Sequence, residues 1–280
     1  MLFWAAMAGW LIRVEAFPQW FGRPAACYRA LLDDAPAAMD SWMQILFRDR
    51  TIGYSRFRLD TQEHDPSARY LLNHQVVLRL AILGAQHQVN GTAEAALDAW
   101  RQLQRFTLAL RGGPYVFRAD GRRTGKTSFE VRLDGSAGPS RLTLEIPDDV
   151  VLYSPMQEVQ LKRLRPGEQL RLRTLDPFSF KPSEILVEAV SWEPVVVSGR
   201  TTNALALRVT SGRVSLRAWM DAEGRVLREE SPMGWVLEAC TPEQALAWVA
   251  SPDAGSQEEQ LQEWGGLFER LKTGMLSRED

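Results

Sequence analysis

The sequence predicts a mainly β fold: an extensive antiparallel curled sheet or unclosed half-barrel with a short inserted helix and C-terminal helices. Apolar and polar residues alternate in many short runs, the period that places them on opposite faces of a pleated sheet. Glycine- and proline-containing turns separate these runs closely, so consecutive strands pair antiparallel, because a parallel crossover needs a longer connection. A twisted sheet of so many strands tends to curl or split, which favours the half-barrel.

The first run of strands begins with a hairpin at residues 41–60. It has apolar residues on one face of each strand and a predicted turn at Asp49-Arg50. From Tyr70 to Ile82, Leu72 and each second residue after it are apolar except His74, which predicts a strand with one buried face. Further strands are predicted at FTLAL, YVFRAD, SFEVRL and RLTLEI, with turns at RGGP, DGRRTGK and DGSAGPS.

A short helix interrupts the strands. Ser154 is a suitable N-cap, Pro155 suits the first helical position, and Pro166-Gly167 ends the segment. A second run of strands follows, with turns expected at Gly199, Gly212 and Gly224. Its strands are predicted at EQLRLRTL, ILVEAVSWEPVVV, NALALRVT, RVSLRAWMD, RVLREES and WVLEAC.

The sequence predicts two helices in the C-terminal region. Thr241, Pro242 and Gln244 form a capping pattern that starts a short helix through about Ala250. Residues 251–280 are predicted to form an amphipathic helix, whose apolar stripe advances by threes and fours through Leu261, Trp264, Phe268, Leu271 and Met275. Two adjacent glycines weaken this helix, so we expect it to need a surface, either its own domain or a partner.

In the N-terminal segment, residues 1–21, the apolar run stops at Arg13, so it is shorter than the roughly 20 apolar residues that cross a bilayer. It is predicted to be an export signal or membrane anchor, because Trp4, Trp10 and Trp20 suit a membrane interface. An interfacial helix and a helix packed on the domain are the alternatives. Residues 22–40 are expected to connect this segment to a β-rich half-barrel domain at 41–250.

Composition excludes some classes of function. The 280 residues are 45% hydrophobic and 24% charged, which is typical of a folded protein. A formal net charge of -2 gives no electrostatic basis for binding nucleic acid. The two cysteines, Cys27 and Cys240, cannot form a zinc site alone and match no thiol redox motif, although they could form one disulfide.

Motifs that resemble catalytic or binding sites are better explained as structure. Gly125-Lys126-Thr127 lacks the first glycine of a phosphate-binding loop and precedes a strand instead of a helix, so a hairpin turn is predicted. His64, His74 and His87 lack metal-ligand spacing, and Asp148-Asp149 suits a turn or cap. We therefore predict no catalytic residue, no metal site and no cofactor.

A basic cluster and three tryptophans are the remaining candidates for binding. Arg118, Arg122, Arg123 and Lys126 could touch anionic lipid headgroups, although a charged hairpin tip is the commoner explanation. The weak candidates for a ligand-lined concavity are Trp192, Trp219 and Trp235, for which core packing is the alternative.

Three stretches carry a resemblance to known proteins: WMQILFRDRTIGYSRFRL, LRPGEQLRLRTLDPFSF and AWMDAEGRVLREESPMGWVLE. In this order they resemble exported bacterial proteins, some of which carry a transglutaminase-like module after a β-rich N-terminal region. That region in turn is similar to the unclosed barrel of outer-membrane lipoprotein carriers, in which a curved sheet and helical lid shelter acyl chains. After Cys240 we expect only short helices and no transglutaminase-like core, so no catalytic residue is carried over and Tyr54 is interpreted as a strand aromatic.

The resemblance and the sequence together predict a non-enzymatic protein of the bacterial cell envelope. We expect it to be membrane-anchored through residues 1–21, to face the periplasm and to bind an amphipathic or acyl ligand in the half-barrel. An accessory scaffold subunit of a membrane complex such as a transporter is the alternative, and an unrecognised hydrolase is the third hypothesis.

Overall fold

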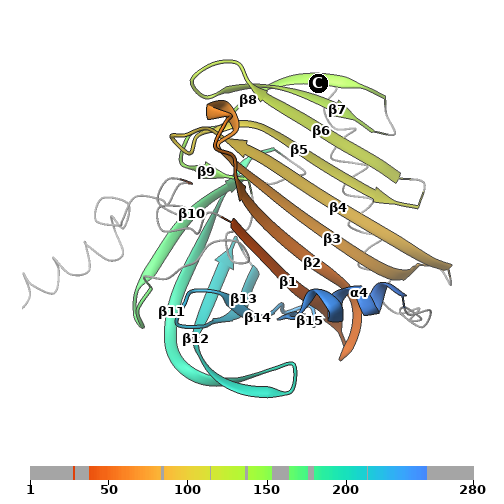
Figure 1. Ribbon diagram of the computed structural model, residues 1–280, viewed down its shortest axis with the longest axis vertical. Coiled ribbons are helices and arrows are strands. Elements are labelled where there is room, and N and C mark those ends of the chain that lie inside the picture. The colour runs from red at the N-terminus through yellow and green to blue at the C-terminus, as the bar shows by residue number, and fades with distance from the viewer. Residues whose placement is uncertain are drawn as a thin grey trace, which may run out of the picture.

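One continuous sheet of fifteen strands dominates the computed structural model of the chain (Figure 1). The structure describes residues 28, 38–82, 85–113, 115–135, 138–152, 164–175, 180–212 and 214–250. The first eight strands are β1 (Ala38–Phe47), β2 (Arg50–Thr61), β3 (Tyr70–Ile82), β4 (Ala85–Leu97), β5 (Leu103–Gly112), β6 (Tyr115–Arg123), β7 (Ser128–Asp134) and β8 (Ser140–Glu145). The others are β9 (Val150–Val151), β10 (Gln169–Leu175), β11 (Pro182–Val197), β12 (Arg200–Ser211), β13 (Val214–Met220), β14 (Val226–Glu230) and β15 (Trp235–Ala239).

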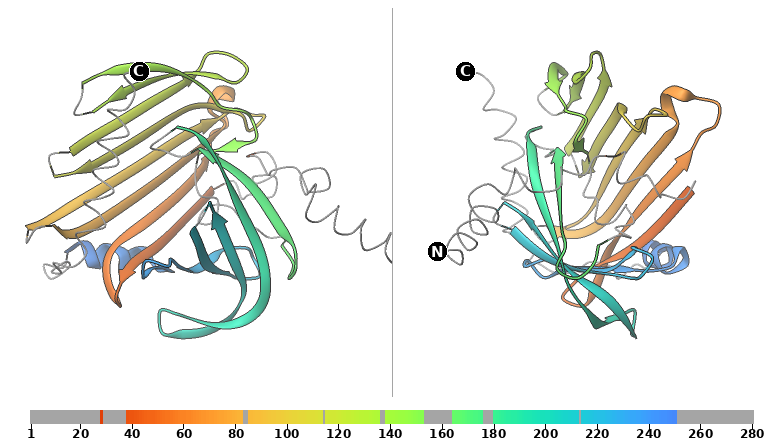
Figure 2. Two further views of the ribbon diagram at one scale, coloured as in Figure 1. Left: turned by 180° about the vertical axis from the view of Figure 1, so that it is seen from behind. Right: turned by 90° about the vertical axis from the view of Figure 1, so that its left-hand side faces the viewer.

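The strand order explains how the sheet can curl. From one end to the other it is β8-β7-β6-β5-β4-β3-β2-β1-β15-β14-β13-β12-β11-β10-β9, so the first and last strands of the chain pair in the middle. All neighbours are antiparallel except β9 and β10, which are parallel and lie on either side of a long connection. The sheet bends so that β10–β12 stand across from the wall of β1–β8 (Figure 2). The predicted curled, unclosed antiparallel sheet is confirmed.

The main core fills the space between these two walls. It includes Phe57 and Phe106 from the first wall and Leu172 and Leu207 from the second, all 2% exposed or less. Tyr28, ten residues before β1, is 4% exposed in this core, and its hydroxyl accepts a hydrogen bond of 2.9 Å from the Leu152 backbone N–H. A residue of the predicted connector 22–40 therefore belongs to the packed interior.

The first hairpin forms as predicted, with its turn shifted by one residue. Phe47 pairs with Arg50, so the turn residues are Arg48 and Asp49, whose φ angles are 48° and 62°. Positive φ at both positions matches the two-residue turns whose twist suits a hairpin. A bulge after Ile45 brings Gly53 against β3, where a Cβ atom would lie 2.1 Å from a backbone oxygen. Only glycine permits this approach.

Two predictions about the first wall need correction. Strand β4 was not recognised as a whole, because AQHQVNGTAEAAL is poor in β-branched residues and contains Asn-Gly, a turn signal. Gly121 was placed in a turn, but β6 continues to Arg123 and the turn lies at residues 124–127. A Cβ atom on Gly121 would approach the Phe106 ring to 2.1 Å, so the glycine provides space for a core side chain.

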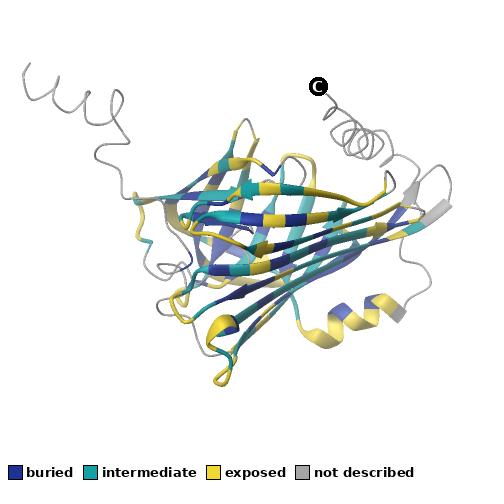
Figure 3. Cartoon of the chain, turned by 90° about the horizontal axis from the view of Figure 1, so that it is seen from above, coloured by how far each residue is buried: buried dark blue, intermediate teal, exposed yellow. Residues whose placement is uncertain are grey.

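The helix α4 (Pro242–Ala250) confirms the capping prediction. The Thr241 hydroxyl accepts from the Gln244 N–H at 3.3 Å, and the Gln244 side chain accepts from the Thr241 N–H at 2.9 Å. The helix lies outside the sheet and turns buried residues towards it and exposed residues away from it (Figure 3). A 3-10 turn, η2 (Pro66–Ala68), precedes β3.

Other predicted segments lie outside the described residues. These are the apolar segment 1–21, the core of the inserted helix at 153–163 and the amphipathic segment 251–280. Within the described ranges, no helix has the length and hydropathy needed to cross a bilayer.

Candidate functional site

A second apolar cluster lies on the inner face of the sheet, on β1–β5 and the neighbouring β15, beyond the main core. We call it the end cluster. It consists of the buried residues Ile45, Ile52, Leu78, Leu80 and Val89 and the partly buried Phe47, Val76, Leu110, Trp235 and Leu237. These residues belong to β1–β5 and β15, which are neighbours in the sheet. Within the described part of the chain, the end cluster therefore draws its apolar side chains from one layer, whereas the main core draws on two.

Two glycines lie among the residues of the end cluster. Gly53 lies between Ile45 and Leu78 across three strands, and Gly91 lies between Val76 and Leu110. A Cβ atom on Gly91 would lie 3.9 Å from each of these two side chains. The Gly91 backbone is thus flanked by two aliphatic side chains, whereas at Gly53 the space is taken by the close approach of β3.

Polar groups lie at the edge of the end cluster. Phe47 and Trp235 pack with ring centroids 5.9 Å apart and planes at 58°, and the Arg48 guanidinium lies 5.3 Å above the Phe47 ring. On the other side, His87 pairs with Leu80 across β3 and β4 and is partly buried. The surface thus combines an apolar centre with a cation at its rim, the chemistry that an amphipathic anion requires.

A partly buried polar pair lies between the end cluster and the main core. The Ser55 hydroxyl and the His74 Nε2 atom are 2.7 Å apart. Ser55 pairs with Val76 of the end cluster, and His74 pairs with Phe57 of the main core. Burial lowers the pKa of His74 to about 4, so the imidazole is neutral near pH 7. The pair mutually satisfies two polar side chains at the boundary of two apolar clusters.

The three candidate tryptophans lie in three different environments. Trp235 belongs to the end cluster, Trp219 is 5% exposed on the outer face, and Trp192 is 44% exposed on β11. They do not form one lining. Whether any of them contacts a ligand stays a prediction.

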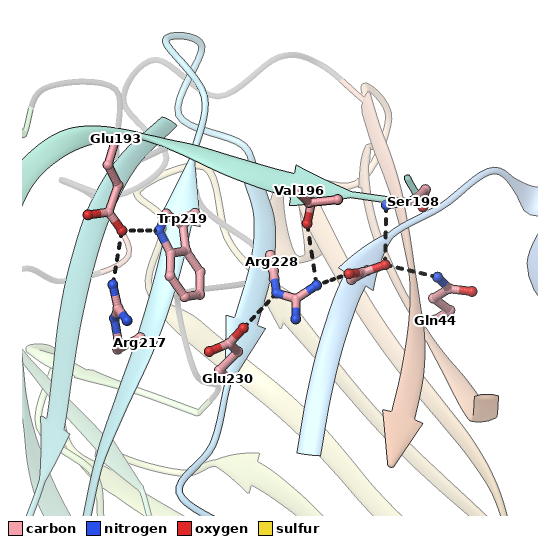
Figure 4. A network of polar contacts seen from close by, with 9 residues as sticks. Gln44, Glu193, Val196, Ser198, Arg217, Trp219, Arg228 and Glu230 are labelled. Carbon is pink, nitrogen blue, oxygen red and sulfur yellow. Dashed lines mark hydrogen bonds and ion pairs between the residues drawn. The ribbon is translucent and has the colours of Figure 1, made fainter. Parts of the chain in front are cut away.

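Trp219 is buried by the far part of the β11–β12 hairpin, residues 192–203, which we call the arm. The arm extends beyond the other strands and curves beneath them (Figure 1). Val195 of the arm packs with Trp219, and the Trp219 Nε1–H donates to Glu193 at 2.7 Å (Figure 4). Pro194 tolerates its place in β11 because β10 no longer flanks that strand there.

Ion pairs fasten the arm to the outer face of the sheet. Arg217 donates to Glu193 at 2.9 Å, and Arg228 donates to Glu238 and to the backbone oxygen of Val196 (Figure 4). Glu238 also accepts from the Ser198 N–H at 3.3 Å. These hydrogen bonds and ion pairs hold the arm against the outer face of the sheet.

The outer face of the first wall carries a separate polar groove. Its volume is about 420 Å³, and it is lined by residues of β2–β5 that include Arg58, Asp60, Glu94 and Arg105. Arg58 forms an ion pair of 2.7 Å with Asp60, which lies two residues further along β2 on the same face. The lining has three arginines and two carboxylates, and the third arginine, Arg56, forms an ion pair of 2.6 Å with Asp40, so charges of both signs are nearly balanced here.

Two motifs that were predicted to have structural roles do form parts of turns and connections. Gly125-Lys126-Thr127 forms the bend between β6 and β7, where the Gly125 N–H donates to Ser128. Asp148 and Asp149 form ion pairs with Arg123 at 2.9 Å and Arg173 at 2.7 Å. These two pairs tie the β8–β9 connection to both walls.

The remaining reactive side chains have structural surroundings. Cys240 is a free thiol whose pKa is raised to about 11 by burial. Burial also raises the pKa of Tyr54, which packs with Trp42 and Trp248 beneath α4 as a strand aromatic. Among the described residues, no three acidic, cysteine or histidine side chains are grouped as metal ligands.

Comparison with known proteins shows only distant similarity. No known family and no curated protein matches the sequence. A β-barrel-like protein of the domain of unknown function DUF1849 from Brucella abortus is 9% identical, with a TM-score of 0.48 over 72% of this chain and 95% of that chain. A DUF1089 family protein from Pseudomonas aeruginosa is 14% identical, with a TM-score of 0.37 over 68% of this chain and 94% of that chain.

Both TM-scores are below 0.5, so neither structure carries an argument about this chain. The strand pairing itself defines the half-barrel. The resemblance to transglutaminase-associated proteins and lipoprotein carriers stays a prediction.

Proposed function

We propose that the chain is a non-enzymatic binding protein that holds an amphipathic, acyl-containing ligand on the end cluster. The observation that carries this proposal is the position of the cluster: ten apolar residues of β1–β5 and β15 gather on the inner face of the sheet, outside the main core. The main core is already filled by facing side chains from both walls. A ligand in the half-barrel is therefore best accommodated at the end cluster.

The side chains at the rim favour a ligand with an anionic headgroup. Arg48 is exposed in the hairpin turn and lies over Phe47, so an acyl chain on the cluster would bring its headgroup near a cation. Each buried methylene contributes about 0.8 kcal/mol, or roughly a fourfold gain in affinity. Affinity should therefore rise with acyl chain length until the cluster is covered.

The location that suits this function is the cell envelope. We propose that residues 1–21 deliver the chain to the membrane or anchor it there, with the half-barrel on the periplasmic side. The support for this is the apolar, tryptophan-rich sequence of that segment. Lipid ligands are abundant at that surface.

An accessory scaffold subunit of a membrane complex is the second candidate function. The specific observation in its favour is on α4, where Leu246 is 51% exposed and Val249 is 37% exposed. Exposed aliphatic residues one helical turn apart could contact a partner protein.

Titration of the full chain with a fluorescent long-chain fatty acid tests the proposed function. We expect one saturable site, and we expect Leu110→Glu to weaken it at least tenfold, because a buried charge would oppose the acyl chain. The matched control is Ala109→Glu, which lies on the opposite face of the same strand and should leave binding unchanged.

Two results would contradict the proposal. One is the absence of saturable binding by acyl chains of any length; the other is equal loss of binding in both variants. Recovery of a stoichiometric membrane-protein partner that depends on Leu246, with no acyl binding, would support the scaffold function instead.

A further inference from the structure

Strand β8 is the terminal strand of the first wall. It pairs with β7 on one side, and the strand order places no further strand beyond it in the described part of the chain (Figure 1). A terminal strand carries a row of backbone N–H and C=O groups that can pair with another strand. The strand at the opposite end of the sheet, β9, has only two residues, so β8 has the longer edge.

The pairing of β8 with β7 shows which backbone groups lie along this edge. The Ile146 N–H donates to the Thr127 oxygen at 2.8 Å, and the two strands pair without a bulge. In an antiparallel pair, residues that bond directly to the neighbour alternate with residues whose N–H and C=O groups point away from it. The even-numbered residues of β8 therefore bond to β7. The residues that direct their backbone groups to the edge, which we call the edge-facing residues, are Arg141, Thr143 and Glu145.

The edge-facing residues are complementary to a second copy of themselves. Two copies of one strand related by a two-fold axis pair antiparallel. With the axis at Thr143, Arg141 of one copy lies directly opposite Glu145 of the other, and all the edge-facing residues exchange backbone hydrogen bonds. An axis at Arg141 or at Glu145 would place like charges opposite each other, which is unfavourable.

Two prolines define the same centre. Pro139 and Pro147 lie four residues before and four residues after Thr143. Proline has no N–H to donate to a neighbouring strand. An axis shifted by one residue in either direction would place a charged edge-facing residue opposite a proline, and a hydrogen bond would be lost. The axis at Thr143 keeps both prolines just outside the paired segment.

Both charged side chains are accessible to a second copy. The Arg141 side chain is 74% exposed, and its contact with Glu130 is 3.7 Å long. The Ser128 and Thr127 hydroxyls donate to the exposed Glu145, which lowers the pKa of that carboxyl below its ordinary value and keeps it charged near pH 7. A cross-strand ion pair can therefore form here without breaking a buried interaction.

The other face of β8 fits the same pairing. Leu142 and Leu144 are partly buried and pack against the main core, so they carry the apolar inner face to the end of the wall. With the axis at Thr143, Leu142 of one copy lies opposite Leu144 of the other. The pairing would thus join the apolar inner faces of two walls and remove these edge side chains from water.

We propose that the edge of β8 binds a second copy of this chain, paired antiparallel about Thr143. The dimer joins two first walls into one continuous sheet and leaves both end clusters in place. It is a closed assembly, because each β8 then has a neighbour on both sides and no third copy can add there. This pairing does not depend on the proposed ligand.

Charge reversal tests the register of the pairing. Sedimentation equilibrium of the full chain should show monomers and dimers in equilibrium. Arg141→Glu and Glu145→Arg should each weaken dimerisation about tenfold, because one reversal places like charges opposite each other twice in the dimer. The double variant Arg141→Glu, Glu145→Arg restores opposite charges and should recover most of the affinity. The matched control is Arg118→Glu on β6, away from the edge, which should leave dimerisation unchanged.

Two results of this experiment would overturn the proposal. One is a full chain that stays monomeric up to its solubility limit. The other is a double variant that dimerises as weakly as the single reversals, because loss without rescue would mean that the two side chains do not lie opposite each other.

Cysteine pairing identifies the residue on the axis. In the full chain with Cys27 and Cys240 replaced by serine, Thr143→Cys places two thiols opposite each other with Cα atoms about 5.5 Å apart, a separation that a disulfide can bridge. Oxidation should therefore join two molecules. In the matched control Arg141→Cys, the two thiols lie about 13 Å apart along the strands and should stay unlinked. Equal linkage in both variants would overturn the register, and no linkage of Thr143→Cys would show that the edge has a different occupant.

Discussion

The main core and the end cluster are two apolar regions on the same face of the first wall, and they differ in what lies opposite them. Phe106 and Phe129 of the main core, with ring centroids 6.1 Å apart, are enclosed by side chains from the second wall. Phe47 and Trp235 of the end cluster remain partly exposed, although they belong to the same sheet. A continuous apolar face is thus closed by a second wall in one part, while in another part its described apolar partners come from neighbouring strands.

The difference arises from the path of the second wall. Strands β10–β13 contribute Leu172, Val187, Leu207 and Met220 to the main core and nothing to the end cluster. The arm continues from this wall to the outer face, where it buries Trp219. Two-layer packing provides stability, and a one-layer apolar face provides a surface that something else can cover.

Truncation of an aromatic ring in each region should give the largest contrast. Phe106→Ala should lower the free energy of unfolding by about 3–5 kcal/mol, because the ring is 2% exposed and packed from both sides. Phe47→Ala should cost clearly less, since its ring is partly exposed. Urea denaturation of both variants measures the difference, and equal losses would show that the end cluster is as much a folding core as the main core.

Acid should weaken the boundary between the two regions through His74. Its folded pKa of about 4 lies below the ordinary value of 6.5, so the unfolded chain binds the proton first and stability falls as pH drops from 6.5 to 4. The loss is about 3 kcal/mol at about 1.4 kcal/mol per pKa unit. Denaturation at a series of pH values should show this slope in the wild type, while His74→Gln flattens it. A slope that persists in the variant would assign it to other groups.

Removing one hydroxyl tests how far the main core depends on Tyr28. In Tyr28→Phe the Leu152 N–H loses its hydrogen-bond acceptor in a buried place, which should cost about 1–2 kcal/mol. Thermal denaturation measures the loss. An unchanged midpoint would mean that Tyr28 does not contribute this bond to the folded state.

The smallest expected effect concerns α4, on the reverse side of the strands that carry the end cluster. Thr241→Ala removes the acceptor for the Gln244 N–H and should cost about 1 kcal/mol. Thr241→Ser keeps the acceptor and should preserve stability. If the two variants unfold alike, the cap does not contribute measurably.

Residues with strong local preferences were predicted well. Thr241 and Gln244 form the expected capping box, and Gly199, Gly212 and Gly224 lie at turns with φ of 76°, 57° and 82°. Residues whose role depends on distant neighbours were predicted poorly. Strand β4 has a weak signal of its own and is held by β3 and β5, and Gly121 lacks a side chain because Phe106 occupies the space.

The candidate ligand-binding residues also depend on distant neighbours, so the sequence could not distinguish them. Trp192, Trp219 and Trp235 are equivalent in sequence, since each lies in a strand-like run. In the structure, Trp192 is exposed, Trp219 is buried under the arm and Trp235 belongs to the end cluster. These differences arise because the path of the arm and the end of the second wall depend on the whole sheet. The signal that could have indicated the end cluster is the alternation from Leu72 to Ile82, which identifies the inner face but not what covers it.

The sequence by itself determined the alternation of faces, the turns and the helix cap, because these depend on residues within a few positions of one another. Only the tertiary structure decided that β1 pairs with β15, that the two walls face each other and that Tyr28 is buried between them. The physical reason is that burial depends on which strands stand opposite. One inner face is therefore packed against the second wall at Phe57, while at Leu78 the described apolar partners come from neighbouring strands.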